Sequence, residues 1–319
     1  MDGPLERSGS GSPGGDSPGA DDRPAAESPG NGNRPAAETF GVVDGPSANP
    51  TPAEIRRFRT LIYDYYRAYG RDFPWRQGVT PYKVFLSEFM LQQTQVSRVE
   101  GYFRRFLESF PEVGTLASAS LAEVLTLWQG LGYNRRAKHL WLAAREVADR
   151  YGGKLPEHEE ELRSLPGIGP YTAAAIRAFA FNIPAVVIDT NIRRIFIHFF
   201  FPGAESVHDR EIVPIVEATM DRQAPREWYY ALMDYGAILS KWFPNPNRRS
   251  AHYAKQSPFE NSNRQIRGKI LRWLTGNGEL QVAEAPRRVD VEAERLEEVL
   301  DALEKEAFIR RTGDRVTLA

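Results

Sequence analysis

Two carboxylates, Glu88 and Asp189, have sequence surroundings that predict acid–base chemistry. The neighbours of Glu88 at i−4, i−3 and i+3 are Val84, Phe85 and Leu91, so desolvation on an apolar helix face should raise the pKa of its carboxyl. Asp189 stands at the expected N-cap of a helix, whose dipole favours the ionised form. Carboxyl groups with pKa values pushed apart are typical of an acid paired with an electrostatic stabiliser. Taken alone, each residue also fits an ordinary surface glutamate or a simple helix cap.

The glycine-rich turn LPGIG, at residues 165–169, is a second element that predicts ligand binding. Its glycines, Gly167 and Gly169, permit positive φ and let backbone N–H groups approach a ligand closely. The helix expected from Tyr171 to about Phe181 directs the positive end of its dipole to the same place. We therefore expect a phosphate site here, although such a turn can also simply join two packed helices.

The elements that must position these residues are helical. Residues 51–260 show helical apolar spacing and no convincing alternating strands, which predicts an all-α domain. One long helix is expected from Tyr82 to about Leu107, and it carries Glu88. Residues 1–50 are rich in Gly, Pro and Ser and are expected to be a disordered tail.

Residues 261–319 are expected to form a small winged-helix-like module. The pattern predicts a helix, a short strand, a second helix and a terminal hairpin, at Asn263–Thr275, Glu279–Val282, Val291–Glu306 and around residues 312–314. The second helix is acidic, so we do not expect it to enter a DNA groove.

Charge and composition narrow the classes of partner and cofactor. The net charge of the 319 residues is −1, but residues 1–50 carry −5, residues 276–319 carry −4, and the stretch between them carries +8. This basic middle indicates an anionic partner. The chain has no cysteine, which excludes disulfides, thiol nucleophiles and a cysteine-ligated iron–sulfur cluster. No histidine pair has metal-ligand spacing, so we expect no metal and no cofactor.

Five motifs in order give the sequence a family resemblance. They are SEFMLQQTQV (Ser87–Val96), WQGLGYNRRAKHL (Trp128–Leu140), LPGIGPYTAAAI (Leu165–Ile176), IDTNIRR (Ile188–Arg194) and LMDYGA (Leu232–Ala237). Together, over about residues 55–255, they resemble the helix-hairpin-helix (HhH-GPD) superfamily of DNA glycosylases, and within it the adenine glycosylases of the MutY type. The resemblance implies that the helices of this region form two lobes.

The resemblance implies roles for the catalytic candidates. Glu88 matches the glutamate that protonates a flipped purine at N7, and Asp189 matches the aspartate that stabilises the sugar oxocarbenium ion or traps it covalently. Asn191 matches the neighbour that assists this aspartate. Tyr171 falls where bifunctional relatives carry a Schiff-base lysine, and because a phenol cannot form an imine, hydrolysis without a lyase step is implied.

The resemblance also implies which residues bind the substrate. The residues that match the base pocket are Trp75, Arg76 and Asp234, and those that match residues inserted into the duplex are Gln92, Gln93 and Tyr133. The hairpin residues that match strand-holding positions are Leu165, Gly167 and Gly169. The loop that matches the family's four-cysteine loop has the same length but none of the cysteine ligands. Its basic residues, including Arg248 and Arg249, are expected to contact DNA.

The function expected from these features is a monofunctional DNA glycosylase that removes adenine mispaired with guanine or 8-oxoguanine. The family's C-terminal domain that senses 8-oxoguanine has no counterpart in the sequence, so the opposing base stays open. Two alternatives remain: a glycosylase for thymine or uracil mismatches, and a non-catalytic DNA-binding protein. We expect a monomer that acts on double-stranded DNA with a mismatched or damaged pair. The sequence lacks a signal-peptide pattern and a membrane-length apolar run, which favours a cytoplasmic location, associated with the nucleoid if the source is prokaryotic.

Overall fold

A computed structural model of the chain describes residues 50–253 and 259–319. The expected N-terminal tail, apart from Pro50, lies outside the described residues. No helix of the described ranges is long and apolar enough to cross a membrane.

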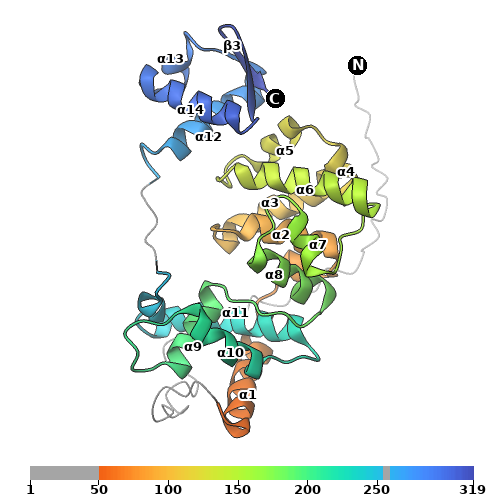
Figure 1. The fold of residues 1–319 in the computed structure, drawn as a ribbon, viewed down its shortest axis with the longest axis vertical. Coiled ribbons are helices and arrows are strands. Elements are labelled where there is room, and N and C mark those ends of the chain that lie inside the picture. Colours follow the sequence, from red (N-terminus) through yellow and green to blue (C-terminus); the bar gives the residue numbers. More distant parts are fainter. Residues whose placement is uncertain (1–49, 254–258) are drawn as a thin grey trace, which may run out of the picture. The chain divides into compact units, whose positions relative to one another are not determined.

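The region up to residue 253 is helical throughout its regular elements (Figure 1). It consists of α1 (Pro52–Tyr69), η2 (Pro74–Arg76), α2 (Pro81–Leu91), α3 (Val96–Ser109), α4 (Val113–Ser118), α5 (Leu121–Trp128), α6 (Arg135–Tyr151), α7 (Glu159–Ser164), α8 (Pro170–Phe181), α9 (Thr190–Phe200), α10 (Asp209–Thr219), α11 (Pro225–Trp242) and η3 (Pro246–Arg249), where η denotes a 3-10 helix. The expectation of an all-α region is confirmed.

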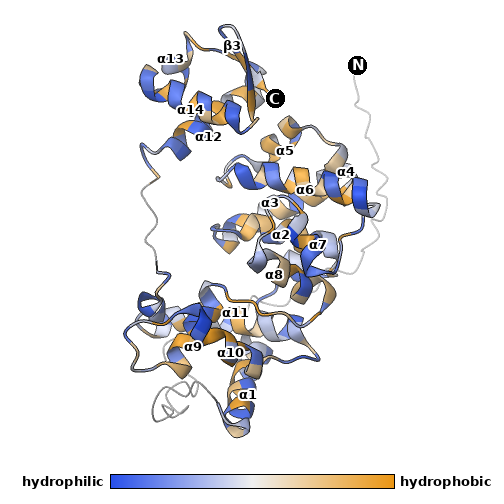
Figure 2. Cartoon of the chain, in the orientation of Figure 1, coloured by the Kyte–Doolittle hydropathy of each residue, from blue (hydrophilic) through white to orange (hydrophobic). Residues whose placement is uncertain are grey.

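These helices pack as two lobes. Helices α2 to α8 contact one another in one lobe, while α1 packs against α10 and α11, and α9 packs against both of these, in the other. The second lobe has an aromatic centre, where the ring of Phe58 meets the rings of Phe196, Phe200 and Trp228 at centroid distances of 5.1–5.8 Å. Figure 2 shows apolar residues gathered where α9 and α10 meet. The first helix of the described residues therefore completes the lobe built by later helices.

Helices α2 and α8 form the centre of the first lobe and contact each other. Nearly every side chain of α2 from Tyr82 to Met90 is buried, and so is nearly every side chain of α8 from Thr172 to Ala180. The alanines of α8 allow the two helices to approach closely, because their side chains occupy little space. This packing brings the middle of α2 next to the start of α8.

The expected helix from Tyr82 to Leu107 is wrong, because the chain breaks between α2 and α3. Gln93 has φ of 55° in the left-handed region, although the segment contains no glycine or proline. The buried side chain of Arg136 explains the break: its Nη1 donates to the carbonyls of Phe89, Met90 and Gln92 at 2.9, 2.8 and 2.6 Å. A side chain from α6 thus satisfies the carbonyls that a continuous helix would have used.

Residues 263–318 contain three helices and a small sheet. They are α12 (Asn263–Asn277), β1 (Glu279–Gln281), α13 (Ala285–Val289), α14 (Ala293–Lys305), β2 (Ile309–Thr312) and β3 (Arg315–Leu318). The sheet is antiparallel in the order β1-β3-β2, with Leu280 opposite Val316 and Ile309 opposite Leu318. The expected helix, strand, helix and hairpin are confirmed, and α13 was not expected. The module boundary at residue 260 stays a prediction.

Candidate active site

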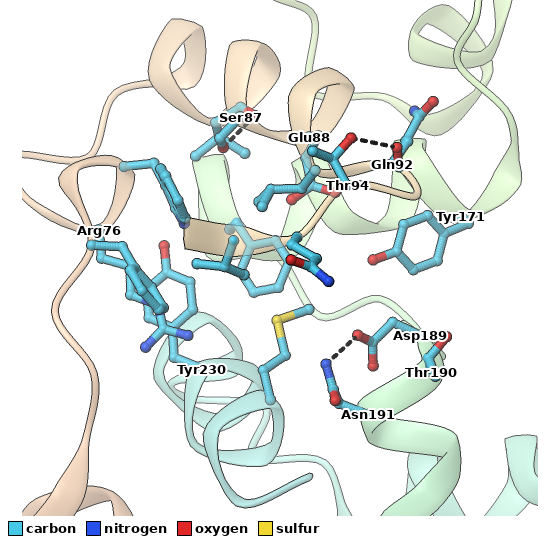
Figure 3. Close-up of a pocket in the computed structure, with 18 of the residues that line it drawn as sticks. Arg76, Ser87, Glu88, Gln92, Thr94, Tyr171, Asp189, Thr190, Asn191 and Tyr230 are labelled. Carbon is cyan, nitrogen blue, oxygen red and sulfur yellow. Dashed lines mark hydrogen bonds between the residues drawn. The ribbon is translucent and has the colours of Figure 1, made fainter. Parts of the chain in front are cut away.

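A pocket of about 570 Å³ lies where the two lobes meet, and it brings the two carboxylates together (Figure 3). Its walls come from η2, α2, loop 92–95, and the first residues of α8 and α9, with α11 closing one side. Of the residues expected at the site, the pocket is lined by Trp75, Arg76, Glu88, Gln92, Gln93, Tyr171, Asp189 and Asn191. The rest of the expected residues lie outside it.

Glu88 occupies the middle of α2 and is 8% exposed. Its carboxyl makes no hydrogen bond with the described residues, so nothing in the protein offsets its loss of water. Burial, and next the charge of Asp189, raise the pKa of Glu88 from 4.5 to about 8. The predicted direction is confirmed. At neutral pH this residue is a carboxylic acid that can donate a proton.

Asp189 is the N-cap of α9, as predicted. Its Oδ1 accepts from the Ile192 N–H at 2.7 Å, and its Oδ2 accepts from Asn191 Nδ2 at 3.1 Å. Burial nevertheless raises the pKa of Asp189 above 3.8, and the hydrogen bonds from Ile192 and Asn191 and the charge of Arg193 only partly offset it. The expectation that the helix terminus would lower this pKa is therefore wrong, because desolvation is the larger effect.

Tyr171 is the second residue of α8, directly after Pro170. Figure 3 shows its hydroxyl pointing into the pocket, toward the side where Glu88 and Asp189 lie. Burial of this hydroxyl, followed by the charges of Glu88 and Asp189, raises the pKa of Tyr171 well above 10. The phenol is therefore neutral and contributes no amine or phenolate nucleophile.

An arginine and three aromatic rings form the wall opposite the carboxylates. The guanidinium of Arg76 lies 4.4 Å from the ring centroid of Tyr230 and 5.0 Å from that of Phe73. The ring of Trp75 is stacked on Phe73 with centroids 5.1 Å apart. These flat surfaces suit a planar aromatic ligand.

Asp234 lies behind this wall and does not line the pocket. It is 2% exposed, and its carboxylate accepts five hydrogen bonds, from Arg71 and Arg76. The two bonds from Arg76 are 2.9 Å long. Asp234 therefore fixes the guanidinium of Arg76 against the pocket, in place of the direct contact with a base that we expected.

Sequence reasoning missed four residues of this wall: Phe73, Phe179, Tyr230 and Met233. The rings of Phe179 and Tyr230 are stacked, with centroids 5.2 Å apart and an interplanar angle of 6°. Tyr230 and Met233 lie four residues and one residue before Asp234 on α11. Helical spacing from the LMDYGA motif was the signal that could have found them.

The hairpin residues lie outside the pocket. Leu165 is 2% exposed and belongs to the core. Gly167 has φ of 77°, and an added Cβ would lie 2.6 Å from the Cβ of His139, so this position requires glycine. Gly169 is the N-cap of α8, where an added Cβ would meet no atom of the chain within 4 Å. Tyr133 also lies outside the pocket, on the far side of loop 92–95.

The segment around η3, where the resemblance places the family's cysteine loop, is attached to the first residue of α9 and to the residues that follow that helix. Arg249 Nη1 donates to the carbonyls of Pro202 and Ala204 at 3.1 and 3.3 Å, and Asn247 Nδ2 donates to that of Thr190 at 2.9 Å. The guanidinium of Arg249 is thus used inside the protein, whereas Arg248 is exposed. Contact of either arginine with DNA stays a prediction. No cluster of metal-ligating side chains occurs among the residues that the structure describes.

Known proteins are similar to this region in sequence and in fold. The model of the HhH-GPD superfamily base excision DNA repair protein matches residues 86–213. An adenine DNA glycosylase of Mycolicibacterium smegmatis is 37% identical over 66% of this chain and 76% of that protein. One of Buchnera aphidicola is 35% identical over 57% of this chain, which spans about half (52%) of that relative. The structure of a thermostable thymine-DNA glycosylase, 25% identical, matches with a TM-score of 0.51 over 58% of this chain and 86% of that chain.

Proposed function

Because this chain belongs to the HhH-GPD superfamily of DNA glycosylases and is related to the adenine DNA glycosylases, we propose that it hydrolyses the N-glycosidic bond of adenine mispaired with guanine or 8-oxoguanine. One observation carries the proposal: Glu88, whose pKa is raised to about 8, shares a pocket with Asp189. This is an acid able to protonate a leaving base, next to a carboxylate able to stabilise the sugar cation.

The base must first leave the duplex, because the glycosidic bond cannot be reached inside it. The aromatic wall of Trp75 and Tyr230 then offers flat surfaces to the extruded base, while Arg76 is held rigid by Asp234. A pocket with its polar groups fixed in advance loses little entropy when the base enters.

The chemical step needs one proton and one water molecule. Glu88 gives its proton to N7 of adenine, and the bond between C1′ and N9 breaks as both of its electrons move to the base. Asp189 stabilises the oxocarbenium ion, with Oδ1 and Oδ2 oriented by Ile192 and Asn191. Water then adds to C1′ and loses a proton, which leaves an abasic site and free adenine. Because Tyr171 carries no amine, we expect the DNA strand to stay intact until alkali is added.

A glycosylase for thymine or uracil mismatches is the second candidate. It is favoured by the structural match to a thymine-DNA glycosylase and by Tyr171. The two candidates differ in their need for Glu88, because a pyrimidine leaving group has no N7 to protonate.

One assay separates these possibilities. Purified protein in excess is incubated with end-labelled duplexes that carry A, T or U opposite G or 8-oxoguanine, and half of each sample is treated with alkali. We expect cleavage only of the A-containing strand and only after alkali. Cleavage confined to T or U would support the second candidate, and no cleavage of any duplex would contradict both.

A further inference from the structure

Helix α11 carries two buried tyrosines, Tyr230 and Tyr235, whose hydroxyls make no hydrogen bond with the described residues. Their exposed fractions are 8% and 0%. A polar group that is buried without a partner costs free energy, so each hydroxyl needs an explanation. Tyr235 is enclosed by aromatic rings, with the centroids of Tyr65 and Trp242 at 5.2 and 6.3 Å, and it does not line the pocket. Tyr230 lines the active-site pocket, so a ligand can reach its hydroxyl.

The hydroxyl of Tyr230 is directed into the pocket. Figure 3 shows it pointing away from α11 and toward the helix that carries Ser87 and Glu88. Burial raises the pKa of Tyr230 to about 12, with a smaller contribution from the charge of Glu88. The phenol therefore keeps its proton at neutral pH, and its oxygen can both donate and accept a hydrogen bond.

Contacts with two other elements hold the ring of Tyr230 in place. It is stacked on the ring of Phe179 of α8, with an interplanar angle of 6°, and the guanidinium of Arg76 lies 4.4 Å from its centroid. Arg226, one helical turn before Tyr230 on α11, fixes Phe179 in turn. Its Nε and Nη2 donate to the carbonyls of Phe179 and Ala180 at 2.5 and 2.8 Å. The hydroxyl thus has a preset position, so little entropy is lost when a ligand binds to it.

The chemistry of adenine selects the group that this hydroxyl meets. In the proposed mechanism Glu88 gives its proton to N7, which places the N7 edge of the purine against α2. Beside N7 on that edge, the hydrogen-bonding group is the exocyclic amine at C6, because C8 on the other side carries only a C–H group. We propose that Tyr230 is a specificity-determining residue, whose hydroxyl accepts a hydrogen bond from the exocyclic amine of the extruded adenine. This assignment rests on the proposed function.

The test uses the full chain and duplexes in which one 2′-deoxy-2′-fluoronucleotide stands opposite guanine. Fluorine at C2′ destabilises the sugar cation, so binding is measured without base release. The base of this nucleotide is adenine in one duplex and purine, which lacks only the amine, in the other. The variant is Tyr230→Phe, which keeps the ring and its stacking. The matched control is Tyr235→Phe, which removes an unpaired hydroxyl from the same helix, away from the pocket.

Binding is measured by fluorescence anisotropy, and base release from the same duplexes without fluorine is followed in parallel. We expect the wild type and the control to bind the adenine duplex about tenfold more tightly than the purine duplex, as for a hydrogen bond whose loss leaves a buried group unpaired. Tyr230→Phe should bind the two duplexes about equally, because it lacks the oxygen that meets the amine.

Equal affinities in the wild type, a preference that Tyr230→Phe keeps, or a loss that the control shares would overturn the assignment. If the wild type released no base from the adenine duplex without fluorine, but showed the preference and its loss in Tyr230→Phe, the proposed hydrolysis would be wrong and the role of Tyr230 would stand. Release of adenine without any such preference would support the proposed function and remove Tyr230 from base selection.

Discussion

The surroundings of the two active-site carboxyls differ in hydrogen bonding rather than in burial. Glu88 lies in the middle of α2, where the backbone N–H groups already donate to carbonyls of the helix. Burial is the main cause of its high pKa. Asp189 lies at the start of α9, where the N–H of Ile192 and the side chain of Asn191 donate to it. Burial raises both pKa values, so hydrogen bonds decide which carboxyl ionises first. The acid is the one without donors.

Glu88→Gln should cause the largest effect, because it removes the proton donor but keeps the shape of the side chain. General acid catalysis is typically worth about 10²- to 10⁴-fold in rate. In the wild type, the single-turnover rate of adenine release should be constant between the pKa of Asp189 and the pKa of about 8 of Glu88, and it should fall above the latter as Glu88 loses its proton. The variant should lack this fall. A variant with the wild-type rate and pH profile would make Glu88 an ordinary helix residue and favour the thymine or uracil alternative.

The same substitution should change how the free energy of unfolding depends on pH. In the unfolded chain the carboxyl ionises near 4.5, whereas in the folded chain it holds its proton up to about 8. Folding stability of the wild type should therefore fall as pH rises from 4.5 to 8, by about 5 kcal/mol at 1.36 kcal/mol per pKa unit. Urea unfolding at pH 5 and pH 9 should show Glu88→Gln gaining on the wild type at the higher pH. An equal gap at both values would argue against the raised pKa.

Asp189→Asn tests the other carboxyl. Asparagine can still cap α9, so the fold and the binding of an abasic-site duplex should survive. Loss of the negative charge at the sugar should raise the activation free energy of base release by about 3–4 kcal/mol, which is the usual size of such electrostatic stabilisation. Single-turnover assays with a binding control measure both quantities. Full activity of the purified variant would remove Asp189 from the mechanism.

Asn191→Ala should have the smallest effect, since it makes the surroundings of Asp189 resemble those of Glu88. It removes a 3.1 Å hydrogen bond to Oδ2, which is worth about 1.5 kcal/mol for a charged acceptor, or roughly a tenfold loss of rate. The pKa of Asp189 should rise further. On the acid side of the pH profile, the rate of the variant should therefore begin to fall at a higher pH than the rate of the wild type. A uniform loss at all pH values would indicate that Asn191 acts through packing, for example through its 3.0 Å contact with Arg194.

Local sequence was sufficient for every feature that depends on neighbours along one helix. The burial of Glu88 follows from the apolar spacing around it, and the cap at Asp189 follows from its residue type before a helical run. The positive φ of Gly167 and the order of the elements after residue 262, except for α13, were readable for the same reason. These features arise from contacts between residues a few positions apart.

Other features required contacts between distant segments. Helix α2 ends at Leu91 because Arg136, 44 positions beyond Gln92, takes its last carbonyls, and no residue in the segment itself signals a stop. Asp234 lies behind the pocket wall, where its carboxylate accepts hydrogen bonds from Arg71 and Arg76. These two arginines lie near the start of the helical region, far from Asp234 in the sequence. The pKa of Asp189 rises because the lobes bury it, and burial by a second lobe cannot be read from a helix cap. Local spacing therefore fixed which groups could react, while the packing of the lobes decided their charges and their partners.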